Sequence, residues 1–247
     1  MTWRMRCPPL RRNGSAPSAR QADVRQSASM SLPHEPFAGL TLGEFSERLA
    51  SSDPVPGGGS AAAIAASLAA SLVVMVCRLS SDRPKYAAYA ATHERALLVA
   101  EASRVRFLEL ADEDAAAYGA YAAASRLPRE TPEEQEHRAT QLRAAARLAS
   151  EVPMLVVREC HRLVREIETL AGRSNLNAAS DLGVAALLAQ AAARGAGANV
   201  QINLPAVGDE RFAGSATAEL GGHLHEIEVV AARVNQQVLS GSLRAPE

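Results

Sequence analysis

The stretch from Asp53 to Cys77, DPVPGGGSAAAIAASLAASLVVMVC, decides the fold class. Two prolines and three glycines lead into a run of small and apolar residues, from Ala61 to Cys77, that contains no charge. Alanine is the best helix former, and the run is a little short for a membrane span, which takes about 20 residues. We therefore predict a buried core helix from Ser60 to Leu79. A membrane-associated bundle is the alternative interpretation of the same run.

The composition favours helices throughout the 247 residues. Hydrophobic residues make up 47% of the chain and aromatic residues only 4%, so the core must be built mainly from Ala, Leu and Val. Such a core suits closely packed helices better than sheets. The 26 Lys and Arg residues balance the 27 Asp and Glu residues, which gives no support to nucleic-acid binding.

Cysteine and histidine usage points away from disulfides and metals. Cys7, Cys77 and Cys160 form no CxxC pair, so neither a disulfide framework nor a zinc site is indicated. His161 follows Cys160, but no third ligand lies at metal-ligand spacing. We expect no metal and a cytoplasmic protein.

Start and stop signals divide the chain beyond Leu40 into helices. Thr41 and Glu44 fit a capping box, and other helices are expected to begin near Asp82, with Asp82 as its cap, near Thr131 and near Asp209. The predicted ranges are 41–51, 60–79, 82–126, 131–171, 178–194, 198–204 and 209–240. We predict an all-α bundle of long antiparallel helices in a single domain of residues 40–247, with a kink at Pro153.

Residues 1–39 differ from the rest of the chain. They are rich in Arg, Ser and Pro, and Asp23 and Glu35 are their only acidic residues. They lack the apolar segment of a secretory signal, and this composition buries too little apolar surface to offset ordering. We predict a disordered tail, or a true start at Met30 with upstream codons included in error.

The glycine loop from Pro56 to Ser60 has the composition of a ligand-binding turn. Gly57, Gly58 and Gly59 free the backbone to approach another group closely, and we expect Ser60 to cap the helix that follows. A bare loop at a helix N-terminus favours carboxylates and phosphates. A tight turn before a buried helix is the equal alternative.

Three acids, Asp112, Glu113 and Asp114, lie near the middle of a predicted helix, where Asp is a poor helix former. Tyr118 and Tyr121 follow Asp114 at helical spacing and share its face. A carboxylate on a face otherwise made of Ala and Tyr is a candidate for a raised pKa and for proton transfer. A solvated acidic patch is the alternative.

Asparagines gather late in the chain. Asn199 and Asn203 are four residues apart, so on a helix both amides point the same way. Paired amides can bind the edge of a heteroaromatic ring, although buried amides more often satisfy backbone groups.

These segments occur in one order: PGGGS at 56–60, D-x-D-x-x-x-Y at 112–118, VP at 152–153, N-x-x-x-x-SDL at 175–182 and NV-x-INL at 199–204. In that order they resemble the cyclodeaminase domain of formiminotransferase-cyclodeaminase and its stand-alone relatives, which include bacterial methenyltetrahydrofolate cyclohydrolases. The resemblance covers about Leu40 to Ser240. Each motif alone is weak, but five in order are specific.

The resemblance implies an all-helical homodimer that acts on tetrahydrofolate carrying a one-carbon unit. It implies no cofactor beyond the folate, no membrane and no nucleic acid, with a separate formiminotransferase as a possible partner. It places the catalytic acid on Asp114. The substrate-binding residues expected from it and from the patterns above are Pro56, Gly57, Gly58, Gly59, Ser60, Tyr118, Ser180, Asp181, Asn199 and Asn203.

The leading hypothesis is a formiminotetrahydrofolate cyclodeaminase. In it, Asp114 accepts the N10 proton of the folate and then donates to the leaving ammonia. A methenyltetrahydrofolate cyclohydrolase on the same scaffold is the first alternative. A non-catalytic helical bundle that binds folate or serves as a scaffold is the second.

Overall fold

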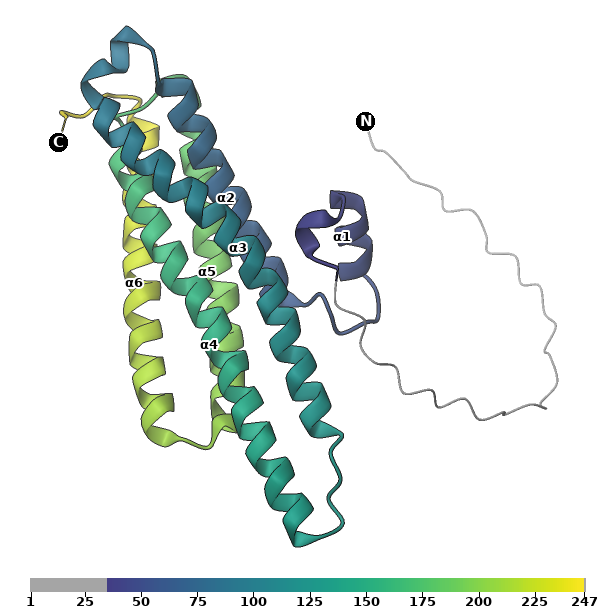
Figure 1. Ribbon diagram of the computed structural model, residues 1–247. Coiled ribbons are helices and arrows are strands. Elements are labelled where there is room, and N and C mark those ends of the chain that lie inside the picture. Colours follow the sequence, from purple (N-terminus) through teal and green to yellow (C-terminus); the bar gives the residue numbers. More distant parts are fainter. Residues whose placement is uncertain (1–34, 247) are drawn as a thin grey trace, which may run out of the picture. The chain divides into compact units, whose positions relative to one another are not determined.

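The structure, a computed structural model, describes residues 35–246. They form six α-helices: α1 (Leu42–Leu49), α2 (Gly58–Ser80), α3 (Ala90–Ser125), α4 (Pro132–Leu170), α5 (Ala179–Val207) and α6 (Glu210–Ser240) (Figure 1). Three short 3-10 helices accompany them: η1 (Phe37–Gly39), η2 (Pro84–Tyr89) and η3 (Leu176–Ala178). The described residues contain no strand, so the all-α prediction is confirmed for them. The predicted tail disorder and the alternative start at Met30 lie outside the described residues.

The bundle is built from five long helices. α2, α3, α4 and α5 form a ring in which each helix packs on the next and α5 packs back on α2, while α6 covers α4 and α5 (Figure 1). Short connections make successive helices antiparallel. α2 is therefore flanked by α3 and α5, and the other helices hold its N-terminus in place.

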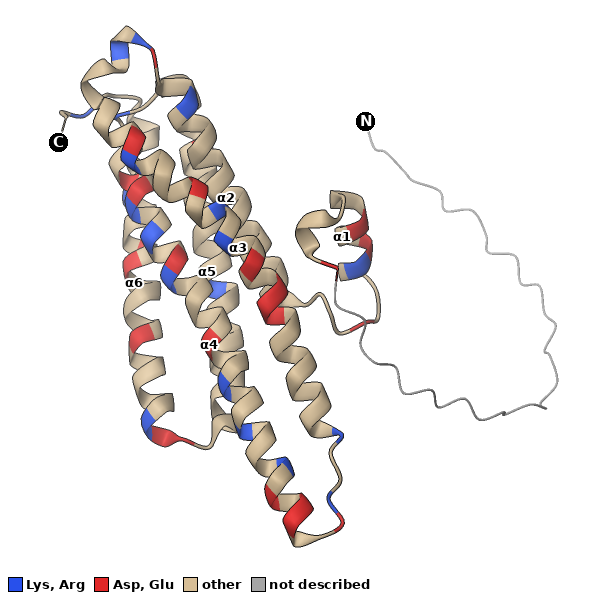
Figure 2. Cartoon of the chain, in the orientation of Figure 1, with Lys and Arg blue, Asp and Glu red and all other residues tan. Residues whose placement is uncertain are grey.

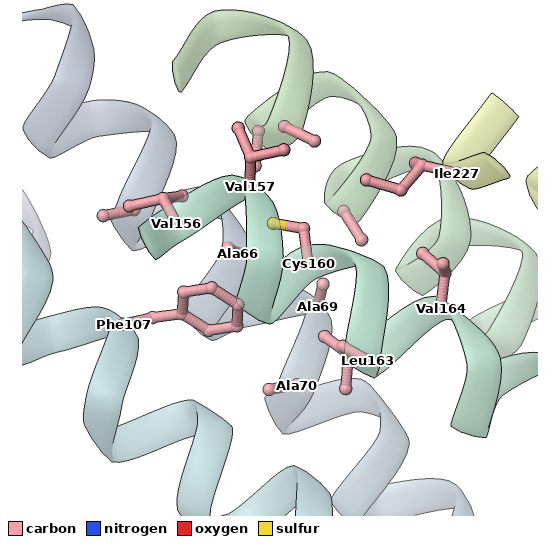
Figure 3. Close-up of a cluster of buried hydrophobic side chains, with 14 of the residues drawn as sticks. Ala66, Ala69, Ala70, Phe107, Val156, Val157, Cys160, Leu163, Val164 and Ile227 are labelled. Atoms are coloured by element: carbon pink, nitrogen blue, oxygen red, sulfur yellow. The ribbon is translucent and has the colours of Figure 1, made fainter. Parts of the chain in front are cut away.

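Small residues on α2 allow its neighbours to pack closely. Ala66, Ala69 and Ala70 are fully buried and face larger side chains such as Phe107 and Leu163 (Figure 3). By length and composition, α2 and the segment Leu176–Val207 are each apolar enough to cross a membrane. However, 61% of the apolar window of α2 is buried inside the bundle, as the core-helix prediction requires.

Three predicted helix starts are confirmed. Thr41 and Glu44 form a capping box before α1, and Thr131 and Glu134 form another before α4. The Asp209 side chain accepts from the Phe212 N–H before α6. Each carboxylate or hydroxyl satisfies an amide that the first turn leaves without a partner.

Two predicted caps were wrong. The N-cap of α2 is Gly57, and Ser60 lies inside the first turn, where its side chain bonds to α3 instead. Asp82 caps nothing: its backbone adopts φ 59°, a left-handed conformation in which Asp is enriched, and η2 follows it before α3 begins at Ala90. Both differences arise from tertiary contacts and turn geometry that spacing does not show.

The two helices predicted at 178–194 and 198–204 are one. α5 continues through Gly195 and Gly197, although glycine disfavours helices. A Cβ on Gly197 would lie 3.1 Å from Leu220 Cδ1, and one on Gly195 would lie 3.5 Å from Ala62 Cβ. Close packing against α6 and α2 therefore accounts for glycine at these positions.

Residues 37–39, which the sequence analysis placed in the tail, form η1 and contact α3. Phe37 is buried, its ring meets that of Phe45 edge-on at 5.5 Å, and its N–H donates to Asp112 Oδ1 at 2.9 Å. These contacts fasten η1 to α3. α4 continues through Pro153, where the sequence predicts a kink.

Candidate active site

A cavity of about 330 Å³ lies beside the N-terminus of α2, between α3 and α5. Gly57, Gly58 and Gly59 line it, together with Asp114, Tyr118, Asn199 and Asn203. A hollow between α3 and α4 is larger, at about 560 Å³, but is lined mainly by Ala and Leu. Convergent polar groups, more than size, distinguish a binding site, so we identify the first cavity as the candidate active site.

Asp114 is the one charged residue among the described residues that line this cavity. The fully buried Ser60 hydroxyl lies 3.0 Å from Asp114 Oδ2 and 3.0 Å from the Ala111 carbonyl, so its single proton can be donated to either oxygen. The contact joins the first turn of α2 to the middle of α3. The serine predicted as a helix cap is thus a partner of the predicted catalytic acid.

Burial raises the pKa of Asp114, and hydrogen bonds from the hydroxyl and backbone of Ser60 oppose that rise. Desolvation disfavours the charged form of a carboxyl, whereas donors to the carboxylate favour it. The raised pKa makes the ionised group a better proton acceptor and keeps a larger share of it protonated at a given pH. Asp114 therefore suits a reaction that needs both a base and an acid.

The glycines of the loop differ in how much space surrounds them. A Cβ built on Gly59 would lie 2.6 Å from Asp114 Cγ and closer still to Oδ1, so any side chain there would displace the carboxyl. A Cβ on Gly58 would meet only Asn199 Nδ2, at 3.9 Å, which is ordinary contact. Gly59 thus allows the carboxyl to lie against the start of α2, whereas Gly58 faces open space.

Asn199 and Asn203 lie on the cavity side of α5, as their spacing predicts. Asn199 Nδ2 donates to the Gly195 carbonyl at 2.9 Å, and Asn203 Nδ2 donates to the Ala149 carbonyl at 2.8 Å. Their amide oxygens accept no hydrogen bond from the described residues. With the nitrogens held, these oxygens are available to a donor on a ligand.

The Ala149 carbonyl lacks its usual donor within α4 because of Pro153. A residue four positions later normally donates its N–H to such a carbonyl, but proline has none. Asn203 takes the place of the missing donor and is fixed at the cavity wall. The sequence pattern around Pro153 predicts a kink and gives no sign of this contact.

Tyr118 and Tyr121 form the outer part of the cavity. They are partly exposed, at 44% and 36%, so their rings line the mouth. Ile202, for which the motifs predict no role, is 77% exposed and also lines the cavity. The aromatic and aliphatic surfaces there suit a flat ring system.

Ser180 and Asp181 lie elsewhere in the chain's own fold. They occupy the first turn of α5, and Asp181 is separated from Asn199 by about 27 Å along that helix, at 1.5 Å per residue. Neither residue lines this cavity within one chain, and the expectation that they bind substrate stays a prediction. Among the described residues, no three His, Cys, Asp or Glu side chains are grouped to hold a metal ion.

The chain is similar to known proteins in sequence and in fold. Residues 41–221 match the model of a family described as formiminotransferase-cyclodeaminase. A methenyltetrahydrofolate cyclohydrolase of Methylorubrum extorquens is 37% identical over 200 residues, 81% of this chain and 96% of that protein. A formimidoyltransferase-cyclodeaminase of Sus scrofa is 34% identical over 204 residues, 83% of this chain but 37% of that protein. The crystal structure of a formiminotetrahydrofolate cyclodeaminase from Thermotoga maritima aligns with a TM-score of 0.75 and 30% identity, covering 82% of this chain and 98% of that one.

Proposed function

We propose a reaction for this chain from one premise: it belongs to the formiminotransferase-cyclodeaminase family. It is an enzyme, and its substrates are tetrahydrofolates that carry a one-carbon unit. We propose that it converts 5-formiminotetrahydrofolate to 5,10-methenyltetrahydrofolate and ammonia. The observation that carries this proposal is the Asp114 carboxyl, which is half-buried beside the cavity and has a raised pKa.

The reaction balances with one carboxyl group acting twice. The N10 nitrogen attacks the carbon of the protonated formimino group on N5, and a tetrahedral intermediate forms. Asp114 as a carboxylate takes the proton from N10, and as a carboxylic acid it gives that proton to the departing nitrogen. Ammonia leaves and the cationic methenyl bridge remains, so Asp114 returns to its starting state. General acid–base catalysis of this kind contributes about 10²–10⁴ in rate.

The surrounding groups orient the substrate. Tyr118 and Tyr121 offer ring faces at the mouth of the cavity, and the oxygens of Asn199 and Asn203 can accept from N–H groups of a pterin ring. The open position at Gly58 leaves backbone amides of the α2 N-terminus accessible to the ligand. A cytoplasmic location and supply of the formimino group by a separate formiminotransferase are part of the same proposal.

A cyclohydrolase is the second candidate, and one observation favours it. The relative with 37% identity is named a methenyltetrahydrofolate cyclohydrolase and matches over 96% of its length. In that reaction water attacks the methenyl carbon and the ring opens to a formyl group. Asp114 would accept one proton from the water and return it to the leaving ring nitrogen, and the second water proton would be released to solvent as the formyl carbonyl forms.

The test is an absorbance assay for 5,10-methenyltetrahydrofolate run in both directions with the full chain. We expect it to form from 5-formiminotetrahydrofolate together with one equivalent of ammonia, which a second assay measures. Asp114→Asn protein prepared in parallel reports any contaminating enzyme. Hydrolysis of methenyltetrahydrofolate without ammonia release from the formimino substrate would replace the cyclodeaminase with the cyclohydrolase. Folate binding without either reaction would leave a non-catalytic bundle.

A further inference from the structure

The Ser60 hydroxyl lies between two oxygens of α3. Its Oγ is 3.0 Å from Asp114 Oδ2 and 3.0 Å from the Ala111 carbonyl oxygen, and the residue is fully buried. A serine hydroxyl has one hydrogen to donate and two lone pairs that accept. The two oxygens of α3 therefore compete for a single hydrogen, and the ionisation state of Asp114 decides which of them receives it.

The three oxygens can all be satisfied in either ionisation state of Asp114. The ionised carboxyl only accepts, and its charge attracts the hydroxyl hydrogen more strongly than a neutral carbonyl does. When Oδ2 is protonated, it becomes a donor to Ser60 Oγ, and the hydroxyl hydrogen turns to the Ala111 carbonyl. A carbonyl oxygen has two lone pairs, so Ala111 can accept from the hydroxyl in addition to its donor within α3. The exchange needs only the rotation of one hydrogen.

The Asp114 carboxyl itself has little room to move. A Cβ built on Gly59 would lie 2.6 Å from both Cγ and Oδ2 of Asp114, so the carboxyl lies directly against the backbone of α2. The Ser60 N–H donates to the same carboxyl, as an amide of the first helical turn that has no partner within its helix. A change in protonation therefore moves the hydroxyl hydrogen and leaves the carboxyl in place.

Ser67 shows what a serine does at the same interface without a carboxyl beside it. It lies seven residues after Ser60, about two turns along α2, and its Oγ donates to the Arg104 carbonyl of α3 at 2.9 Å. Ser71 and Ser80 donate to carbonyls of α2 itself. Ser60 differs from these three serines because its hydroxyl also reaches a carboxyl group.

The acidic neighbours of Asp114 on α3 have partners of their own. Asp112 accepts from a backbone N–H of η1 at 2.9 Å, and Glu113 pairs with Arg106 at 2.6 Å. Both carboxylates are thus held by other groups, and Ser60 is the residue that bonds to Asp114. The other titratable side chains that line the cavity are the phenols of Tyr118 and Tyr121.

The other helices around the cavity bring no unpaired charge to Asp114. From Gly58 to Cys77, α2 contains no Lys, Arg, Asp or Glu (Figure 2). The charges of α4 and α5 closest in sequence to the cavity residues are exposed and paired, Arg147 with Glu151 at 2.9 Å and Arg194 with Glu228 of α6 at 3.0 Å. The Ser60 hydroxyl is therefore the group placed to respond when Asp114 gains or loses a proton.

We propose that Ser60 is a positioning residue whose hydroxyl changes its acceptor each time Asp114 gains or loses a proton. It donates to Oδ2 of the carboxylate, and it accepts from the protonated carboxyl while donating to the Ala111 carbonyl. Both forms of Asp114 are thereby stabilised in one place. This role rests on the proposed function, in which Asp114 takes a proton from the substrate and returns it.

The hydroxyl proton stays on Ser60 throughout. The proton that Asp114 carries comes from N10 of the folate and goes to the departing nitrogen, and no covalent bond to Ser60 forms or breaks. Ser60 is fully buried and does not line the cavity. In this proposal it therefore acts through the carboxyl of Asp114 and makes no contact with the substrate.

Steady-state kinetics on three variants test this role. Ser60→Ala removes the hydroxyl from both states, so we expect kcat to fall about ten- to hundredfold with little change in KM, and the acid limb of the pH–kcat profile to move to higher pH. Ser60→Thr keeps a hydroxyl on the same carbon and should restore most of both. Ser67→Ala removes a bond between the same two helices, so it should lower the melting temperature without changing kcat or the profile. Parental kcat and profile in Ser60→Ala, or equal losses in Ser67→Ala, would show that Ser60 is only a structural contact.

Carbonyl chemical shifts measured by NMR report the hydroxyl hydrogen without substrate, and do not depend on whether threonine fits. In the full chain, the ¹³C shift of the Ala111 carbonyl is expected to change with pH at the same midpoint as the Asp114 carboxyl, whose signal the Asp114→Asn variant identifies. Most of this change should be lost in Ser60→Ala. The Arg104 carbonyl, which accepts from Ser67, is the control and should not change at that midpoint.

The two measurements distinguish the role of Ser60 from the proposed function. An Ala111 carbonyl shift that stays constant in the parent, or that changes equally in Ser60→Ala, would overturn the exchange of acceptors, because the charge of Asp114 alone would then account for the data. A parent that is inactive on both folate substrates, but whose Ala111 carbonyl still follows Asp114, would overturn the proposed function and leave the motion of the hydroxyl supported.

Discussion

Replacing Gly59 and Gly58 by alanine, one at a time, separates the catalytic use of the glycine loop from its use as a turn. Both glycines lie in the first turn of α2, and neither has a positive φ. The two changes therefore bring the same small gain in helix propensity and backbone entropy, about 0.5–1 kcal/mol. They differ in what the new methyl group meets.

The magnitude follows from the contacts of the added Cβ. At Gly58 the nearest atom is 3.9 Å away, so we expect Gly58→Ala to be neutral or slightly stabilising. At Gly59 the Asp114 Cγ lies at 2.6 Å, while ordinary contact begins at 3.4 Å. The carboxyl must therefore shift by at least the difference, about 0.8 Å, because its Oδ1 lies closer still. Overpacking of this kind costs about 1–3 kcal/mol, and a misplacement near 1 Å can lower turnover by about 10²-fold.

Thermal melting and steady-state kinetics on the two variants check the prediction. Gly59→Ala is expected to melt below the parent and to lose about 10²-fold in kcat, while Gly58→Ala keeps both values close to those of the parent. Parental kcat in Gly59→Ala would show that the carboxyl does not need its place against the start of α2. Equal loss in both variants would show that the loop acts as a unit, with no special role for Gly59.

The remaining predictions concern ionisable groups. Asp114→Asn should lower turnover by about 10²–10⁴ with little change in folate affinity, whereas Asp112→Asn should lower it far less, because its oxygen can still accept from the Phe37 N–H. Burial raises the pKa of Asp114 above the ordinary 3.8, so the folded parent loses stability as the pH rises from 3.8 through the raised pKa. The Asp114→Asn variant does not lose this stability. Its melting temperature relative to that of the parent should therefore increase over the same pH range. Ser60→Ala removes a bond that lowers this pKa, so the acid limb of the pH–kcat profile should move to higher pH. Cys77 and Cys160 should resist thiol reagents until the protein unfolds, because burial raises both thiol pKa values, that of Cys77 to about 12.

The fold could be predicted from the sequence because its signals are local. Capping boxes at Thr41 and Thr131, the cap at Asp209 and an alanine-rich run each specify a helix through neighbours in the chain. The predictions were wrong where contacts between residues far apart in the sequence determine the structure. Gly195 and Gly197, near which two helices were predicted in place of α5, are there for close packing. Phe37, assigned to the tail, is buried and its ring contacts that of Phe45.

The candidate site could be predicted only in part. Helical spacing predicted that Asp114 and Tyr118 share one helix face and that Asn199 and Asn203 share another, and all four residues line the cavity. Spacing could not show that Ser60 bonds to Asp114, because 54 positions separate them and the contact depends on how α2 packs on α3. It also could not distinguish Gly59 from Gly58, because identical residues in adjacent positions differ only in what faces them.

The proline within α4 connects two positions that a sequence comparison would treat separately. Pro153 has no N–H, the Ala149 carbonyl therefore lacks its helical donor, and the Asn203 amide fills that place. Among relatives, a change at one of these two positions should accompany a change at the other, because an N–H restored at position 153 would compete with the asparagine for the same oxygen. The two positions therefore depend on each other, and replacing Pro153 by a residue that has an N–H would release the Asn203 side chain from the wall of the cavity.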